Sequence, residues 1–175
     1  GIYFDASKPS ELENLLNNHE FHDALIEEAK AGMKQFIESG TSRYNLGVKQ
    51  TKQKLYGPKQ QKRVLVAGQA DGHKYVTFSG ARKGITNNDL VKLARQENPD
   101  AQIIYKIHPE VVAGHRRLRS NPADVNHLCT VIWDDLSVDD ALDAVDQVYT
   151  VSSLMGMEAI VRGIKVTCLG HPFYA

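Results

Sequence analysis

From residue 63 onward, short apolar runs alternate with stretches that have helical periodicity. The apolar runs predict strands at Arg63–Ala67, Gln102–Ile107, Thr130–Trp133, Gln147–Val151 and Lys165–Leu169. The periodic stretches between them predict helices at about Asn87–Glu97, Ser137–Val145 and Ser153–Arg162. Alternating strands and helices are typical of βαβ units. The sequence therefore predicts an α/β fold, a Rossmann-like parallel sheet with flanking helices.

The first part of the chain has a different pattern. Ser10 and Glu13 have the spacing of a capping box, and the leucines around them predict a short amphipathic helix. A second helix is expected from about Phe21 to Ser39, and the polar stretch from Gly40 to Lys62 carries turn signals that predict a connector. We therefore divide the chain into a junction segment, residues 1–62, and a Rossmann-like domain, residues 63–175.

Composition narrows the class of ligand. Lys plus Arg and Asp plus Glu each number 21, so we expect no nucleic-acid partner, and any anion must be bound by local groups. Cys129 and Cys168 lie in apolar runs without CxxC spacing, which argues against zinc and a disulfide framework and favours a reducing, cytoplasmic setting. No apolar run approaches the ~20 residues of a membrane span.

Polar residues follow three of the predicted strands. Gly68-Gln69 comes after the first strand, His108-Pro109 after the second, and Ser152-Ser153 after the fourth. In an open parallel sheet, ligands bind beyond the carboxyl ends of the strands. These positions are distant in sequence, but we expect them to be neighbours at one edge of the sheet.

The pair Ser152-Ser153 opens a predicted helix, so its hydroxyls and the first backbone N–H groups are suited to bind a phosphate. The alternative is an ordinary N-cap serine. Glu158 lies in the same helix and could accept hydrogen bonds from ribose hydroxyls. Its alternative is a solvated helix glutamate.

His108 is the second candidate phosphate ligand. Pro109 restricts the backbone beside it, and Lys106 and Arg116 lie close in sequence around a loop that contains Gly114. The alternative is a structural histidine at a strand end. Neither chelating spacing nor an acidic pair accompanies His108, so we expect no metal.

Four segments together resemble capsular polysaccharide proteins of the KpsC type. They are GIYFDASKPSELENLL, VLVAGQ, NPDAQIIYKIHPEVVAGHR and VYTVSSLMGMEAIVRGIKVTCLGHPFYA. The resemblance covers most of the chain and is weakest at about residues 20–61 and 71–83. The order of HP, the Ser-Ser helix start and the terminal GxPFYA makes it specific.

Proteins of this type resemble retaining β-Kdo transferases, which use CMP-Kdo to build the linker between a capsule polysaccharide and a phospholipid. The resemblance implies the nucleotide-binding half of a GT-B glycosyltransferase, cut at both ends, with an acceptor-binding lobe of the same protein preceding Gly1. It implies a lipid-linked Kdo acceptor, contact with capsule assembly or export machinery, and a cytoplasmic position, peripheral at the inner membrane. CMP-Kdo is the donor substrate, and no cofactor is expected.

The resemblance also assigns residues. His108, Ser152 and Ser153 correspond to positions that contact the CMP phosphate, and with them we group Gln69, Lys106, Pro109, Arg116 and Glu158 as donor-binding residues. This chain departs from its relatives at Ala70–Lys74, after the GQ, and at Ile107, where proline is usual.

In the simplest scheme, transfer with retention uses a carboxylate on the face opposite the leaving CMP. Asp5 is the candidate nucleophile, and His108 would stabilise the leaving phosphate; the alternative for Asp5 is a turn-capping residue. We expect the isolated chain to be inactive. Two other functions stay open: an enzyme with a UDP-sugar donor, either a transferase or an epimerase, and a non-catalytic module for capsule export or interaction.

Overall fold

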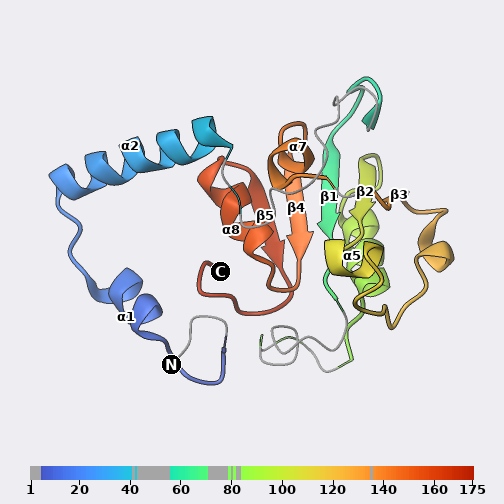
Figure 1. Ribbon diagram of the computed structural model, residues 1–175, viewed down its shortest axis with the longest axis horizontal. Coiled ribbons are helices and arrows are strands. Elements are labelled where there is room, and N and C mark those ends of the chain that lie inside the picture. The colour runs from blue at the N-terminus through green and yellow to red at the C-terminus, as the bar shows by residue number, and fades with distance from the viewer. Residues whose placement is uncertain are drawn as a thin grey trace.

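Five parallel strands form the centre of the molecule in the order β3-β2-β1-β4-β5 (Figure 1). The computed structural model describes residues 5–40, 42, 56–70, 79, 81, 84–134 and 136–175. The strands are β1 (Arg63–Ala67), β2 (Gln102–Lys106), β3 (Thr130–Ile132), β4 (Gln147–Thr150) and β5 (Lys165–Cys168). The predicted parallel sheet is thus confirmed.

The last four strands each end one residue before the predicted boundary. The apolar residues just beyond β2 and β5 still pair with a neighbouring strand. Ile107 donates its N–H to the Ile132 carbonyl at 3.0 Å, and Leu169 donates to the Thr150 carbonyl at 3.0 Å. The hydrophobic run therefore continues slightly past the regular ladder.

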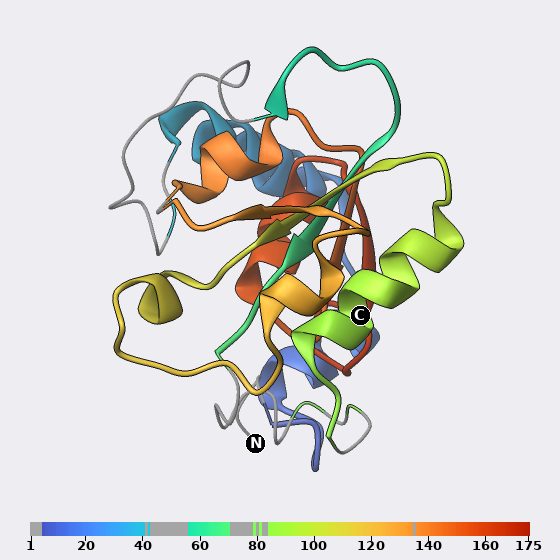
Figure 2. The same cartoon turned by 90° about the vertical axis from the view of Figure 1, so that its right-hand side faces the viewer.

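Helices cover both faces of the sheet (Figure 2). Helix α5 (Asn87–Glu97) and the 3₁₀-helix η1 (Pro122–Val125) pack on one face, with Val64, Val66 and Tyr149 of the sheet. Helices α7 (Val138–Leu142) and α8 (Leu154–Val161) pack on the other. Because β1 is buried on both faces, its sequence is a continuous apolar run rather than an alternating one.

Two short helices among the described residues were not predicted, and α7 is several residues shorter than predicted. Helix α6 (Pro109–Val112) and η1 both lie between β2 and β3, and each has only four residues, too few to show a helical period. Helix α7 ends at Leu142 instead of Val145.

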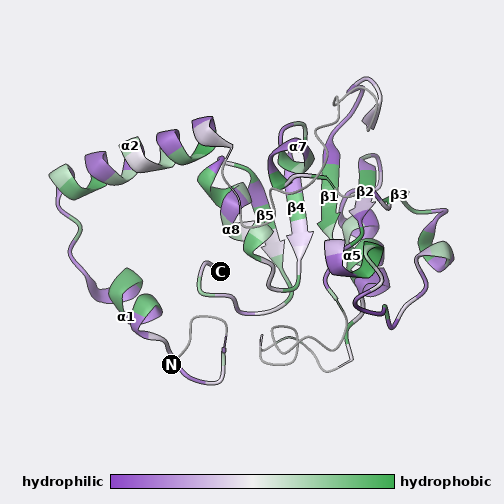
Figure 3. Ribbon diagram, in the orientation of Figure 1, coloured by the Kyte–Doolittle hydropathy of each residue, from purple (hydrophilic) through white to green (hydrophobic). Residues whose placement is uncertain are grey.

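The first two helices, α1 (Glu11–Asn18) and α2 (Asp23–Ser39), extend away from the sheet (Figure 1). The predicted capping box of α1 is confirmed: the Glu13 N–H donates to Ser10 Oγ at 3.1 Å, and the Ser10 N–H donates to Glu13 Oε2 at 2.7 Å. Neither helix buries a residue, and Figure 3 shows apolar positions along both. No helix in the described ranges is long and apolar enough to cross a membrane.

A buried arginine fastens the end of the connector to the amino edge of the sheet. Arg63 is only 2% exposed. Its guanidinium donates to the carbonyls of Tyr56 and Gly57 at 3.2 and 3.0 Å and to Gln102 Oε1 at 2.7 Å, and it lies 5.2 Å from the centre of the Tyr56 ring. Tyr56 itself belongs to the core on the α7–α8 face.

We predict that Arg63→Met lowers the free energy of unfolding by about 3 kcal/mol, because buried carbonyl groups lose their donor. Urea unfolding followed by circular dichroism measures this change. Lys92→Met, at an exposed position of α5, is the matched control and should change stability by less than about 0.5 kcal/mol. Equal stabilities of the two variants would contradict the role given to Arg63.

Candidate functional site

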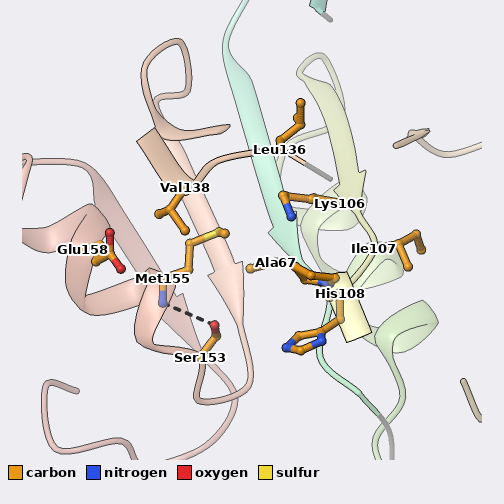
Figure 4. Close-up of a pocket in the computed structure, with 11 residues that line it drawn as sticks. Ala67, Lys106, Ile107, His108, Leu136, Val138, Ser153, Met155 and Glu158 are labelled. Atoms are coloured by element: carbon orange, nitrogen blue, oxygen red, sulfur yellow. Dashed lines mark hydrogen bonds between the residues drawn. The ribbon is translucent and has the colours of Figure 1, made fainter. Parts of the chain in front are cut away.

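A cleft opens at the carboxyl edge of the sheet, between the ends of β1 and β2 and the start of α8 (Figure 4). The strand order of the sheet reverses direction at β1, since β2 and β3 lie on one side of it and β4 lies on the other. Such switch points are the usual ligand sites of open parallel sheets. The cleft is lined by Ala67, Gly68, Lys106, Ile107, His108, Pro109, Leu136, Val138, Ser153, Met155 and Glu158.

His108 lies on the β2 side of the cleft as the N-cap of α6. Its Nδ1 accepts a hydrogen bond from the Glu110 N–H at 3.2 Å. In the neutral ring this places the proton on Nε2, which can then donate to an anion. Figure 4 shows the imidazole on the side of the cleft that faces Ser153. His108 can therefore cap α6 through Nδ1 and bind a ligand through Nε2 at the same time.

Lys106 is the last residue of β2 and is only 3% exposed. In Figure 4 its ammonium group lies in the cleft between Ala67 and Leu136. An ammonium group in the lining of the cleft favours an anionic ligand.

Ser153 forms the opposite wall as the N-cap of α8. Its Oγ accepts a hydrogen bond from the Met155 N–H at 3.3 Å, and its own N–H donates to Thr150 Oγ1 at 3.0 Å. The N-cap reading is thus correct for Ser153, and the residue also lines the cleft. The start of α8 adds the positive end of its dipole to this wall.

Ser152 is arranged differently from Ser153. Its Oγ accepts a hydrogen bond from Gln69 Nε2 at 3.4 Å. Within the part of the chain that the structure describes, it does not line the cleft. The structure therefore separates the serine pair into one residue at the cleft and one bonded to Gln69.

Gln69 uses its side chain to hold the end of β4. Its Oε1 accepts from the N–H groups of Val151 and Ser152 at 3.1 and 2.9 Å and from Thr150 Oγ1 at 3.3 Å. Asn87, the first residue of α5, holds the Gln69 backbone with two hydrogen bonds. Its Oδ1 accepts from the Gln69 N–H at 3.0 Å, and its Nδ2 donates to the Gln69 carbonyl at 2.8 Å. Gln69 thus positions the β4–α8 turn in this structure, and its side chain does not extend toward a nucleotide-sugar donor in the cleft.

Gly68 permits the close approach of β1 and β2 at the cleft. A Cβ atom at this position would lie 2.7 Å from the Lys106 carbonyl oxygen and 2.9 Å from Tyr105 Cε2. Any larger residue would push the ends of the two strands apart.

Glu158 is buried, so its reading as a solvated helix glutamate is wrong. The residue is 8% exposed, and Oε1 accepts from Ser42 Oγ at 2.9 Å. Among the described residues Oε2 has no hydrogen-bond partner, and Arg162 Nη1 lies 3.8 Å from it. Burial raises the pKa of this carboxyl group. A buried carboxylate oxygen at the cleft wall is suited to accept a hydrogen bond from a ligand hydroxyl.

The remaining predicted residues lie in different places. Pro109 lines the cleft, whereas Arg116 does not and instead pairs with Glu110 at 3.6 Å on the surface. Asp5 is also outside the cleft lining of the described chain, and its Oδ1 accepts a hydrogen bond from the Ser7 N–H at 2.9 Å. Hydrogen bonding to the Ser7 side chain, and then to the Ser7 backbone, lowers the pKa of the Asp5 carboxyl group. Residues 1–4 and the departure at 71–74 lie outside the described residues.

Two residues that support the site were missed from the sequence. Asn87 holds Gln69, and the Tyr174 hydroxyl donates a hydrogen bond to the Ser153 carbonyl. Asn87 follows a Thr86 N-cap, a local signal for a helix start but not for a contact with Gln69. Tyr174 belongs to the GxPFYA motif, which indicated a family but no contact. The described residues contain no cluster of three potential metal ligands.

Known proteins are similar to this chain over its whole length. The family model described as capsule polysaccharide biosynthesis protein matches residues 9–175. The chain is 42% identical over 177 residues to the lipopolysaccharide-processing protein LpsZ of Rhizobium meliloti, covering 100% of this chain and 40% of LpsZ. It is 37% identical over 175 residues to the capsule polysaccharide modification protein LipA of Neisseria meningitidis serogroup B, covering 99% of this chain and 24% of LipA.

Two solved structures have the same fold. KpsC beta Kdo 2,4 transferase of Thermosulfurimonas dismutans superposes with a TM-score of 0.87 at 35% identity, covering 100% of this chain and 54% of that one. The beta Kdo 2,7 transferase of the same organism superposes with a TM-score of 0.76 at 32% identity, covering 100% and 52%. The chain therefore spans about half the length of these structures.

Glu158 makes a testable contribution to the pH dependence of stability. Its pKa is raised above 4.5 in the folded chain, so the folded state binds more protons and the free energy of unfolding falls as the pH rises past 4.5. Glu158→Gln removes this titration. The variant should therefore lose less unfolding free energy than the wild type between about pH 5 and about pH 8.

Urea unfolding at the two pH values measures this difference. Glu28→Gln, at an exposed position of α2, is the control and should keep the pH dependence of the wild type. The interpretation fails if Glu158→Gln also keeps it.

Proposed function

The chain belongs to the capsule polysaccharide biosynthesis protein family, and we propose that it is the donor-binding half of a glycosyltransferase that uses CMP-Kdo. In the full-length protein this half would help transfer β-Kdo to a lipid-linked acceptor in capsule synthesis. The similarity to two Kdo transferases over the whole chain supports the reaction class.

One observation carries the proposal. His108 on one wall of the cleft faces Ser153 and the start of α8 on the other, at the switch point of the sheet, and Lys106 also lines the cleft. Charge-assisted hydrogen bonds from an imidazole N–H and an ammonium, together with a helix N-terminus, suit a phosphate dianion or diester. We assign the phosphate of CMP to this space.

Glu158 fits the nucleoside part of the donor. Its buried Oε2 lies deeper along α8 than Ser153 and can accept a hydrogen bond from a ribose hydroxyl. The apolar side chains of Leu136, Val138 and Met155 complete this part of the cleft.

The proposed reaction has two displacements. A carboxylate oxygen attacks the anomeric carbon, and the bond to the CMP phosphate oxygen breaks with its electron pair going to the phosphate. The acceptor hydroxyl then attacks the same carbon, the glycosyl ester breaks, and the hydroxyl proton passes to solvent. His108, Lys106 and the start of α8 stabilise the charge that develops on the leaving phosphate.

Asp5 is our candidate for the carboxylate. In the described structure it lies outside the cleft and bonds to Ser7, so the role requires the remainder of the protein to bring sugar and carboxylate together. The resemblance of the GIYFDA segment to the family supports this assignment. Ser7 lowers the pKa of Asp5, which keeps the carboxylate ionised as a nucleophile must be.

The apolar surface of α1 and α2 supports a larger assembly. Six large apolar side chains on or between these helices are exposed: Leu15, Leu16, Phe21, Ile26, Met33 and Ile37. Since the chain spans only 40% of LpsZ, we propose that the acceptor-binding lobe of the same protein covers them. Capsule assembly or export machinery and the inner-membrane surface are further proposed partners of the whole protein.

We predict that His108→Ala weakens CMP binding by the full-length protein at least about tenfold, because the phosphate loses a charge-assisted hydrogen bond. Isothermal titration calorimetry with CMP measures this, and UMP serves as the competing ligand. His115→Ala, an exposed histidine outside the cleft lining of the described chain, is the matched control.

Three results would count against the proposal. Unchanged CMP binding by His108→Ala would show that His108 does not belong to the phosphate site. A preference for UMP over CMP would favour an enzyme with a UDP-sugar donor. Absence of binding by the wild type would favour a non-catalytic export or interaction module.

For catalysis, we predict that Asp5→Asn lowers transfer from CMP-Kdo to a Kdo-bearing acceptor by about a thousandfold or more. CMP affinity should stay unchanged, because Asp5 lies outside the cleft lining of the described chain. Asp124→Asn, an exposed aspartate of η1, is the control, and the 175-residue chain alone should be inactive in the same assay. Transfer at the wild-type rate by Asp5→Asn would exclude it as the nucleophile.

A further inference from the structure

The C-terminal segment of the chain packs against the start of α8. Leu169 and Gly170 donate their N–H groups to the carbonyls of Thr150 and Val151 at 3.0 and 2.9 Å, which continues the β4–β5 pairing beyond both strands. The segment then turns, and the Ala175 N–H donates to the Pro172 carbonyl at 2.9 Å. This path places Tyr174 next to the β4–α8 turn.

Tyr174 makes two contacts with the first turn of α8. Its hydroxyl donates a hydrogen bond to the Ser153 carbonyl. Its ring lies directly over Gly156, where a Cβ atom would be 2.5 Å from the Tyr174 hydroxyl oxygen and 2.9 Å from the ring. Burial raises the pKa of the phenol, so the hydroxyl keeps its proton and remains a donor at neutral pH.

The acceptor of this bond is the carbonyl of the N-cap residue. The Ser153 carbonyl also accepts the Gly156 N–H at 2.9 Å, so two donors define its direction. A trans peptide is planar, and its N–H points opposite to its C=O. Holding the Ser153 carbonyl toward the helix therefore directs the Leu154 N–H out of the N-terminus, where a helix binds anions.

We infer that Tyr174 is a positioning residue for the donor phosphate, which acts through the Ser153–Leu154 peptide without touching the ligand. The identity of the ligand rests on the function proposed above. Gly156 is part of the same arrangement, because only a residue without a side chain leaves room for the Tyr174 ring.

Tyr174→Phe in the full-length protein tests this inference, since it removes the hydroxyl and keeps the ring. Tyr149→Phe is the matched control: the Tyr149 hydroxyl also has protein partners, Glu97 and Asn98, but it lies on the α5 face and outside the cleft lining of the described residues. CMP affinity is measured by calorimetry, and the Michaelis constants for CMP-Kdo and for the acceptor are measured separately.

We expect Tyr174→Phe to weaken CMP binding about fivefold to tenfold, the effect of losing one buried hydrogen bond. The Michaelis constant for CMP-Kdo should rise by a similar factor, while that for the acceptor stays constant. Tyr149→Phe should lower stability and leave both constants unchanged. Gly156→Ala, which displaces the Tyr174 ring, should reproduce the effect of Tyr174→Phe.

The possible results separate the two proposals. Wild-type CMP affinity in both Tyr174→Phe and Gly156→Ala would overturn the inference and leave the proposed function intact. Equal losses in Tyr174→Phe and Tyr149→Phe would also overturn it, because they would reflect stability alone. Absence of CMP binding by the wild type would overturn the proposed function, and the inference with it.

Discussion

The hydrogen bonds of the Gln69 side chain join the two halves of the sheet at the edge where the cleft lies. β1 and β4 pair directly through a parallel ladder whose last partners are Val66 and Tyr149. Gln69 extends this link beyond the ladder by accepting hydrogen bonds from Thr150, Val151 and Ser152. Asn87 in turn holds the Gln69 backbone against α5. The position of Ser153 opposite His108 depends on this network.

The two edges of the sheet use buried polar groups in opposite ways. At the amino edge, Arg63 donates to two backbone carbonyls and a glutamine, and the described contacts there serve packing. At the carboxyl edge, Lys106 and Glu158 are buried in the wall of an open cleft, and Glu158 keeps a carboxylate oxygen without a hydrogen-bond partner among the described residues. Burying charge in this way costs stability, and proteins retain such an arrangement mainly where a ligand uses it.

The cleft also depends on two glycines that allow other groups to lie close to the backbone. Gly68 lets β1 lie against the Lys106 carbonyl, and Gly156 lets Tyr174 lie on the first turn of α8. Gly68 leaves room for the Lys106 carbonyl behind one wall of the cleft, and Gly156 leaves room for the Tyr174 ring behind the other. The site is thus assembled from three parts of the chain that are far apart in sequence, and its geometry depends on contacts that lie behind the cleft rather than in it.

The sequence by itself determined the order of the five strands along the chain, the strand limits to within one residue, and five residues of the cleft lining: Lys106, His108, Pro109, Ser153 and Glu158. These features have local causes: apolar runs form strands, and residues after parallel strands meet at one edge. Only the tertiary structure decided that Ser152 and Gln69 bond to each other, that Arg116 lies on the surface, that Glu158 is buried, and that Tyr174 bonds to Ser153. The physical reason is the same in each case, because a hydrogen bond or burial that depends on a partner many residues away leaves no periodicity or spacing in the sequence.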